Sequence, residues 1–222
     1  AYPFYNDFEP MQEAKWIGLC EIRRVMLDGL IAEDDRKLKS ESLKLRRDLA
    51  KLNADALTKM RDVSTTDCHL RIVWGGKITK AMGWMPGIFE EVGFSLQHNK
   101  PILILGALGG CARLIADFLR DTKASWPTDL SLTSCADTSR DAWLTADERK
   151  ELEARFARYS QLLRDYRDQL HNGQSTIHKV SVELLRNALD PALGTSSLLS
   201  HVEQFIEQVA QSQPQEPQSP PS

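Results

Sequence analysis

The sequence predicts an α/β fold built around a parallel sheet, and three observations lead to this prediction. Two short apolar runs, "LRIVW" and "PILIL", have the composition of buried strands. Each run stops at glycine, the first at Gly75 and the second at Gly106. A helical pattern follows each glycine turn, and this repeated order of strand, turn and helix is typical of parallel sheets.

The segment before the glycine-rich centre is expected to be mainly helical. In "EAKWIGLCEIRRVML" the apolar residues recur at helical spacing. A polar loop is expected at 32–40 and a charged helix at about 41–62. The many charges of this second helix are interpreted as a solvated face, not as an arm that binds nucleic acid.

The centre is expected to hold two strand–helix pairs. A strand within 70–76 precedes a helix over 86–97, which begins with a proline followed by two glutamates, as helix N-termini prefer. A second strand within 100–106 precedes a helix over 109–121. The apolar face of this last helix consists of Leu114, Ile115, Phe118 and Leu119.

The C-terminal half reads as helical. After an irregular connector, Thr145 and Glu148 form a capping box that opens a long helix ending at Asn172–Gly173. Its apolar stripe is expected to be core or an inter-helix seam and consists of Leu152, Phe156, Tyr159, Leu163, Tyr166 and Leu170. Two shorter helices are expected near 179–189 and 196–211.

These patterns divide the chain into an α/β region over 1–125, a helical C-terminal region over 126–211 and a tail over 212–222. The tail is rich in proline, glutamine and serine, so it is predicted to be disordered.

The composition excludes several classes of protein. The 222 residues carry a formal net charge of −3, so the basic surface of a nucleic-acid-binding protein is not expected. The four cysteines have no metal-site spacing, and no metal is predicted. No apolar run is long enough for a membrane span, and a cytoplasmic location is expected. The chain begins at Ala1, and whether this is a true N-terminus or the start of a fragment is left open.

The glycine turns suggest a site for phosphate. Gly106, Gly109 and Gly110 precede a helix, whose N-terminal amides and dipole favour anions. In an open parallel sheet such turns lie at the carboxyl ends of strands, where ligands bind. The alternative is that the glycines only permit tight turns and close packing. Two such turns in succession favour a nucleotide or phosphate site.

Aromatic and acidic residues near these turns leave alternatives open. Trp74 and Trp84 flank the glycine pair and either stack on a base or pack under a loop. Glu90 and Glu91 are helical neighbours and point about 100° apart. Either one of them contacts a ribose or acts as an acid or base while the other faces solvent, or both are present only because helix starts favour acidic residues.

The same residues carry a resemblance to a known family. The chain contains Met60–Arg61, Gly75–Gly76–Lys77, Gly83 through Pro86–Gly87–Ile88 to Glu90–Glu91, and Lys100–Pro101 to Gly109–Gly110. In this order, over about 56–120, they resemble the SLOG superfamily, which includes the LOG phosphoribohydrolases and the Smf/DprA proteins. The similarity is greatest to the SLOG sensor domains of bacterial anti-phage and nucleotide-signalling systems.

The resemblance implies a Rossmann-like, mostly parallel sheet with an α-helical C-terminal appendage. The first strand of the family has no clear counterpart before residue 56, so the sheet is expected to be incomplete on its N-terminal side. The implied ligand is an NAD-derived or ADP-ribose-type nucleotide, such as a cyclic ADP-ribose isomer. No cofactor is implied. The implied ligand-binding residues are Arg61 at phosphate, Glu91 at ribose, and the glycine-rich set Gly75, Gly76, Lys77, Gly87, Gly106, Gly109 and Gly110.

Three functions therefore remain open. The favoured one is a sensor that relays nucleotide binding to an effector in a bacterial defence system, as a homo-oligomer or through a fused effector. The second is a LOG-like hydrolase of nucleoside 5'-monophosphates, in which Arg61 and Glu91 would be catalytic. The third is a non-catalytic oligomerisation module. An enzyme is less expected than a sensor, and neither membrane nor nucleic acid is an expected partner.

Overall fold

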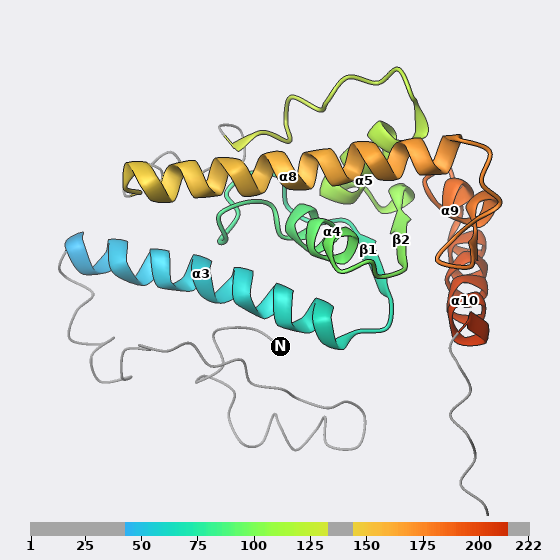
Figure 1. Cartoon of the computed structure of the whole chain (residues 1–222), viewed down its shortest axis with the longest axis horizontal. Helices are drawn as coiled ribbons and strands as arrows, with labels where there is room; N and C mark the ends of the chain where they lie inside the picture. Colours follow the sequence, from blue (N-terminus) through green and yellow to red (C-terminus); the bar gives the residue numbers. More distant parts are fainter. Residues whose placement is uncertain (1–42, 133–143, 213–222) are drawn as a thin grey trace, which may run out of the picture.

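The computed structural model describes residues 43–132 and 144–212. The elements in chain order are α3 (Leu43–Asp67), β1 (Arg71–Trp74), α4 (Gly87–Gln97), β2 (Ile102–Leu105), the 3-10 turn η2 (Gly106–Leu108), α5 (Gly110–Arg120), α8 (Ala146–His171), β3 (Thr176–Ile177), β4 (Val180–Ser181), α9 (Val182–Ala188) and α10 (Thr195–Ser212) (Figure 1). The fold class is α/β, as the sequence predicts.

The two predicted central strands pair in parallel. β1 and β2 lie in register from Arg71 opposite Ile102 to Trp74 opposite Leu105, and α4 forms the crossover between them. All four residues of β2 are buried, in agreement with its wholly apolar sequence. The carboxyl ends of both strands therefore meet at one edge of the sheet, where the two glycine turns begin.

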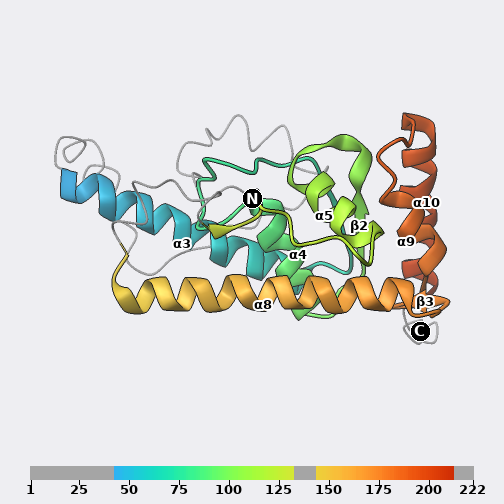
Figure 2. The same cartoon turned by 90° about the horizontal axis from the view of Figure 1, so that it is seen from above.

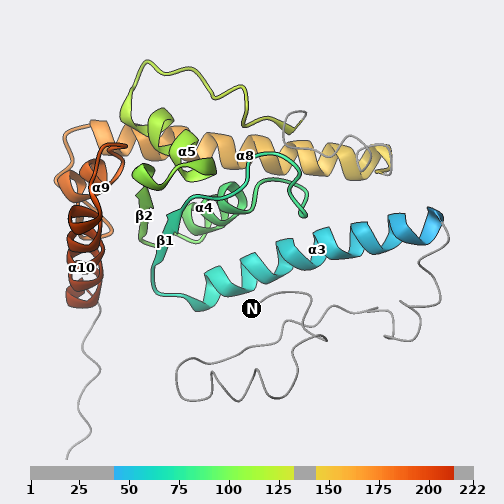
Figure 3. The same cartoon turned by 180° about the vertical axis from the view of Figure 1, so that it is seen from behind.

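Helix α4 lies between two long helices. Figures 1 and 3 show α3 and α8 on opposite sides of α4, and the view from above in Figure 2 agrees. Gly93 allows α8 to come close, because a Cβ at this position would lie 2.3 Å from the ring of Tyr159. Helix α5 packs against both strands and against α8. The crossover helix is thus enclosed, because it packs against α3, α5, α8 and both strands.

Helix α8 begins and packs as predicted. The side chain of Thr145 accepts from the amide of Glu148, and the side chain of Glu148 accepts from the amide of Thr145, which completes the capping box. The Lys51 ammonium donates to Glu148 and, together with the bonds from Thr145, lowers the pKa of that carboxyl to about 2. Five of the six stripe residues are buried, whereas Phe156 is half-buried.

The C-terminal part contains a hairpin that the sequence prediction missed. β3 and β4 pair antiparallel, and the turn between them places His178 and Lys179 at positive φ. This turn lacks the Asn-Gly or Asp-Gly pair that signals a two-residue hairpin, and each strand is only two residues long. The helix expected near 179–189 consequently begins at Val182.

Several sequence predictions lie outside the described residues. They include the first N-terminal helix, the loop over 32–40, the proline-rich tail and the environments of Cys20 and Cys135. The charged helix expected at about 41–62 continues to Asp67. In the described part of the chain, no helix is both long and apolar enough to cross a membrane.

Candidate functional site

The two glycine turns meet at the carboxyl edge of the sheet. The amide of Cys111 donates to the carbonyl of Gly76 at 2.9 Å, and the amide of Ala112 donates to the carbonyl of Gly75, also at 2.9 Å. The turn after β1 is thereby held against the first turn of α5. The two turns are therefore in direct contact, and the predicted anion site at them stays a prediction.

Glycine is required at this junction for geometric reasons. Gly75, Gly76 and Gly110 have φ angles of 60°, 88° and 62°, which L side chains rarely adopt. A Cβ at Gly110 would lie 2.4 Å from the carbonyl oxygen of Gly76. Gly110 thus lets the two turns approach one another, whereas a Cβ at Gly109 would meet no atom within 4 Å.

We call the residues Trp74–Lys77 and Leu108–Gly110 the glycine edge. Two first-turn amides of α5 are used by the carbonyls of Gly75 and Gly76, so they are not available to a ligand. The amide of Gly110 has no hydrogen-bond acceptor among the described residues. Lys77 is exposed, and no carboxylate in the described ranges pairs with it. Within the described ranges, the edge therefore offers one helix N-terminal amide and one cation that are free to bind a ligand.

Apolar side chains are also exposed at the glycine edge. Trp74, at the end of β1, is 56% exposed, and Leu108, at the end of the 3-10 turn after β2, is 51% exposed. Trp84 is instead buried, and its indole N–H donates to Asp55 at 2.7 Å. Of the two tryptophans considered for stacking on a base, Trp84 is a packing residue and Trp74 remains available.

Gly106 has a packing role that differs from the predicted ligand contact. It is buried, and a Cβ there would lie 2.4 Å from the carbonyl oxygen of Leu189 and 2.8 Å from the Cβ of Ala116. This glycine allows the chain after α9 to lie against the end of β2. Its predicted role in ligand binding stays a prediction.

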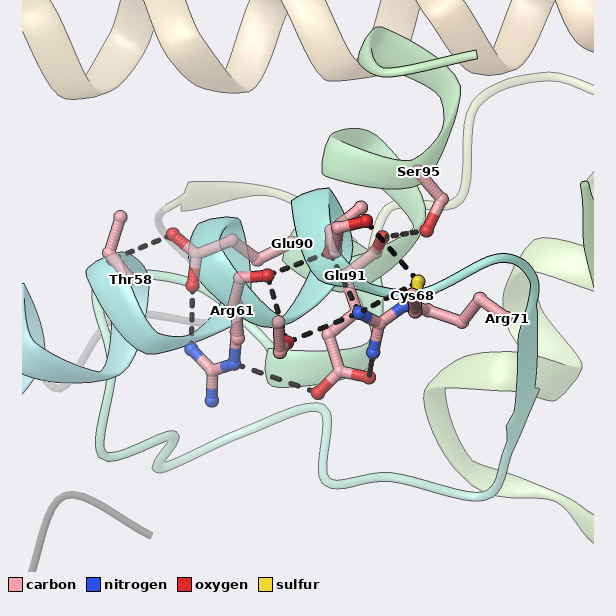
Figure 4. A network of polar contacts seen from close by, with 9 residues as sticks. Thr58, Arg61, Cys68, Arg71, Glu90, Glu91 and Ser95 are labelled. Carbon is pink, nitrogen blue, oxygen red and sulfur yellow. Dashed lines mark hydrogen bonds and ion pairs between the residues drawn. The ribbon is translucent and has the colours of Figure 1, made fainter. Parts of the chain in front are cut away.

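A second group of predicted residues lies beside α4, where Arg61, Arg71, Arg155, Glu90 and Glu91 form what we call the arginine–glutamate cluster. Glu90 is fully buried at its centre. It accepts from Arg61 Nη1 at 2.6 Å and from Thr58 Oγ1 at 2.7 Å (Figure 4). It also lies 3.7 Å from Arg155 Nη1. A single carboxylate thus links α3, α4 and α8.

Glu91 points in a different direction from Glu90, as its helical position requires. One of its oxygens accepts from Arg71 Nη1 at 3.1 Å, and the other lies 3.8 Å from Arg61 Nε. Its side chain is 25% exposed. Neither glutamate is freely solvated, in contrast to the expectation for one of them, because arginines from α3, β1 and α8 converge on α4.

Two glycines make room for the guanidinium group of Arg61. A Cβ at Gly87 would lie 2.7 Å from Arg61 Nη2, and a Cβ at Gly83 would lie 2.9 Å from Arg61 Nη1. The "GWMPG" segment therefore packs on the arginine with its two glycines. Gly87, predicted to bind ligand, contacts Arg61 instead of forming part of the glycine edge.

Apart from Gly106, the predicted site residues consequently fall into two groups on either side of the first turn of α4. Gly75, Gly76, Lys77, Gly109 and Gly110 lie at the glycine edge, and a Cβ at Gly76 would collide with Ile88 of α4. Arg61, Gly87 and Glu91 belong to the arginine–glutamate cluster.

Sequence reasoning missed the roles of Arg71, Arg155, Thr58 and Gly83. Arg155 is one of many charged residues on α8, so its sequence surroundings do not distinguish it. Arg71 carried a signal, because it is a charged residue that starts an otherwise apolar strand. The described residues contain no cluster of three potential metal ligands.

The family comparison agrees with this architecture. The model of the family described as SLOG cluster2 matches residues 1–186 of the 222. The chain belongs to the SLOG cluster2 family. This match covers both the glycine edge and the arginine–glutamate cluster, and it ends within α9. No curated protein and no solved structure gives a significant match to the chain.

Membership of a SLOG family identifies the chain as a SLOG-type, nucleotide-related domain with a Rossmann-like organisation. The family match also confirms the resemblance drawn from the glycine, arginine and glutamate motifs.

Proposed function

We propose that this SLOG domain is a sensor that binds an NAD-derived or ADP-ribose-type nucleotide at the glycine edge. Binding is relayed to an effector of a bacterial defence system, which is either a second copy of the chain or a fused domain. The observation that carries the proposal is the contact of Gly75 and Gly76 with Gly110 and with the amides of Cys111 and Ala112, at the ends of two parallel strands. Ligands of open parallel sheets bind at such ends.

The chemistry of the glycine edge supports a phosphorylated ligand. The Gly110 amide begins a helix whose dipole favours negative charge at that end. Lys77 adds an exposed cation, and Trp74 presents an aromatic surface suited to stacking on a base. Together these groups match the phosphate and the base of a nucleotide.

The arrangement of the glutamates favours recognition over hydrolysis. Cleavage of an N-glycosidic bond needs a carboxyl group that is free to handle a proton near the ribose. Glu90 is fully buried between Thr58 and Arg61, and Glu91 accepts from Arg71. Because both carboxylates are engaged within the protein, the hydrolase is the second candidate.

The ligand test compares two exposed lysines. We expect ADP-ribose, or one of its cyclic isomers, to stabilise the protein by about 2.7 kcal/mol at a hundredfold excess over Kd. Lys77→Ala should weaken binding about tenfold, the effect of losing one charge-assisted contact. Isothermal titration calorimetry and thermal denaturation provide the readouts.

Lys123→Ala is the matched control, since Lys123 is also exposed but follows the far end of α5. Incubation with AMP and NAD followed by chromatography should show no released base. If the unaltered chain releases base and Glu91→Gln does not, the hydrolase would become the favoured function in place of the sensor. If no ADP-ribose isomer at millimolar concentration changes the melting temperature, nucleotide sensing is contradicted.

A further inference from the structure

The arginine–glutamate cluster has unpaired donors and an excess of positive charge. Among the described residues, three of its buried N–H groups lack a hydrogen-bond acceptor, namely Arg61 Nε, Arg71 Nε and Arg155 Nη1. Three arginines also face only two glutamates, which leaves one positive charge unbalanced within the cluster. Since buried polar groups are normally paired, both features indicate a missing anionic acceptor.

Two of these unpaired donors belong to the arginines on either side of Glu91. Figure 4 shows the Glu91 carboxylate between the guanidinium groups of Arg61 and Arg71. The distance is 3.1 Å to Arg71 Nη1 but 3.8 Å to Arg61 Nε, so the carboxylate completes one hydrogen bond and not the other. The two arginines thus enclose the Glu91 carboxylate, which is too small to hydrogen-bond to both guanidinium groups at once.

Glu90 holds Arg61 in the orientation that this space requires. It accepts from Nη1 of Arg61 at 2.6 Å, while Gly87 packs against Nη2. The remaining donor, Nε, lies on the side of Glu91. The Glu90 side chain is 0% exposed, whereas the Glu91 side chain is 25% exposed. Glu91 is therefore the carboxylate that can leave for solvent, and Glu90 is not.

We propose that the space between Arg61 and Arg71 is an oxyanion site for a phosphate group, which Glu91 fills as an internal substitute when no ligand is bound. Each phosphate of an ADP-ribose-type ligand has two non-bridging oxygens, so one phosphate can accept from Arg71 Nη1 and from Arg61 Nε together, while Arg71 Nη2 stays bonded to Thr65 Oγ1 at 2.7 Å. The diphosphate carries two negative charges against one on Glu91, so it also neutralises the excess in the cluster. On binding, the Glu91 carboxylate moves into solvent.

This inference rests on the proposed nucleotide function and adds a regulatory element to it. Gly83 and Gly87, which pack on Arg61, lie at the end of the segment that Gly75–Lys77 begins. One connection between β1 and α4 therefore borders both the glycine edge and the oxyanion site. In this arrangement Glu91 competes with the ligand phosphate, and it opposes binding instead of holding a ribose.

The proposal is tested by whether one substitution, Glu91→Gln, raises or lowers the affinity for the ligand. Glu91→Gln removes the competing charge with little change of shape, so it should bind ADP-ribose and inorganic pyrophosphate about tenfold more tightly than the unaltered chain. Arg71→Lys keeps the charge but loses the guanidinium fork, and it should weaken both ligands about tenfold. Glu183→Gln, on the exposed side of α9, should change neither affinity. Titration calorimetry gives the affinities, and near-ultraviolet circular dichroism confirms that each variant is folded.

The outcomes distinguish the oxyanion site from the proposed nucleotide sensing. Equal or weaker ADP-ribose binding by Glu91→Gln overturns the oxyanion site but leaves nucleotide sensing in place. Tighter pyrophosphate binding by this variant without any ADP-ribose binding supports the oxyanion site and overturns nucleotide sensing. Tighter binding of ADP-ribose alone supports a site that takes phosphate only within a nucleotide. Absence of binding for both ligands in both proteins overturns both proposals.

Discussion

Gly109 and Gly110 show how two adjacent residues with similar φ angles can have different roles. Their φ angles are 76° and 62°, so each adopts a conformation that favours glycine. Their surroundings differ, because a Cβ at Gly110 would meet the backbone of Gly75 and Gly76 whereas a Cβ at Gly109 would meet open space. An alanine would therefore suffer backbone strain at both positions, but a steric clash only at position 110.

We therefore expect Gly110→Ala to be clearly more destabilising than Gly109→Ala. Gly109→Ala should cost about 1–3 kcal/mol through backbone strain alone. Gly110→Ala should cost about 1–3 kcal/mol more, because the added methyl group forces the two turns apart. Denaturant unfolding of the ligand-free chain measures both free energies. Equal losses would show that the two turns are not in contact.

At the scale of the elements, buried charges connect the helices around α4. Glu90 joins α4 to α3 through Arg61 and lies 3.7 Å from Arg155 of α8. Gly93 permits close packing of α4 against α8, and Gly87 permits close packing against Arg61. The position of α4 therefore depends on a charge network as well as on apolar burial.

Removing one partner of this network should be severe, whereas removing both should be mild. We expect Arg61→Met to lose about 3–5 kcal/mol, since it leaves the buried Glu90 without its closest cation. The double variant Arg61→Met with Glu90→Leu should recover most of this loss, because no buried charge remains uncompensated. Urea denaturation of the two single variants and the double variant measures the coupling.

Arg113 provides the control for that experiment. It pairs with Asp117 at 2.7 Å on α5, but both side chains are about two-fifths exposed, at 40% and 44%. Arg113→Met should change stability by only about 0–1 kcal/mol. If the double variant is as unstable as Arg61→Met, then the cost arises from packing and not from the unpaired carboxylate.

For the whole molecule, the apolar core runs across the predicted boundary between 125 and 126. Buried residues of α8, including Tyr159 and Leu163, belong to the same core cluster as β2 and α5. Residues of α9 and α10 extend this cluster to Val209. The division into an α/β region and a helical region remains a prediction, but the shared core indicates that the two parts stabilise one another.

We accordingly expect the full chain to unfold in one cooperative transition. A chain ending at residue 140 would lack α8, so it should lose its near-ultraviolet circular dichroism and the sharp transition. Thermal unfolding followed by both tryptophan fluorescence and far-ultraviolet circular dichroism provides the measurement. Two separate transitions in the full chain would instead support two regions that fold independently.

The predictable features are those that depend on neighbours in sequence. The strand at Ile102–Leu105 was predictable from its unbroken apolar run, and the start of α8 from the capping box of Thr145 and Glu148. The β3–β4 hairpin was not, because two-residue strands joined by His178–Lys179 carry no period and no turn signal. Arg71 and Arg155 were missed because their partners lie 20 and 65 positions away.

By itself, the sequence determined the α/β class, the order of strand and helix around the glycine turns, and membership of a SLOG family. These properties depend on residue pattern and on backbone freedom, which are local in the chain. Only the tertiary structure decided that Gly75 and Gly76 close against α5, that Gly87 packs on Arg61, and that the glutamate pair meets three arginines. Those contacts join residues that are distant in sequence, and the choice among many possible charged partners is made only when the helices pack.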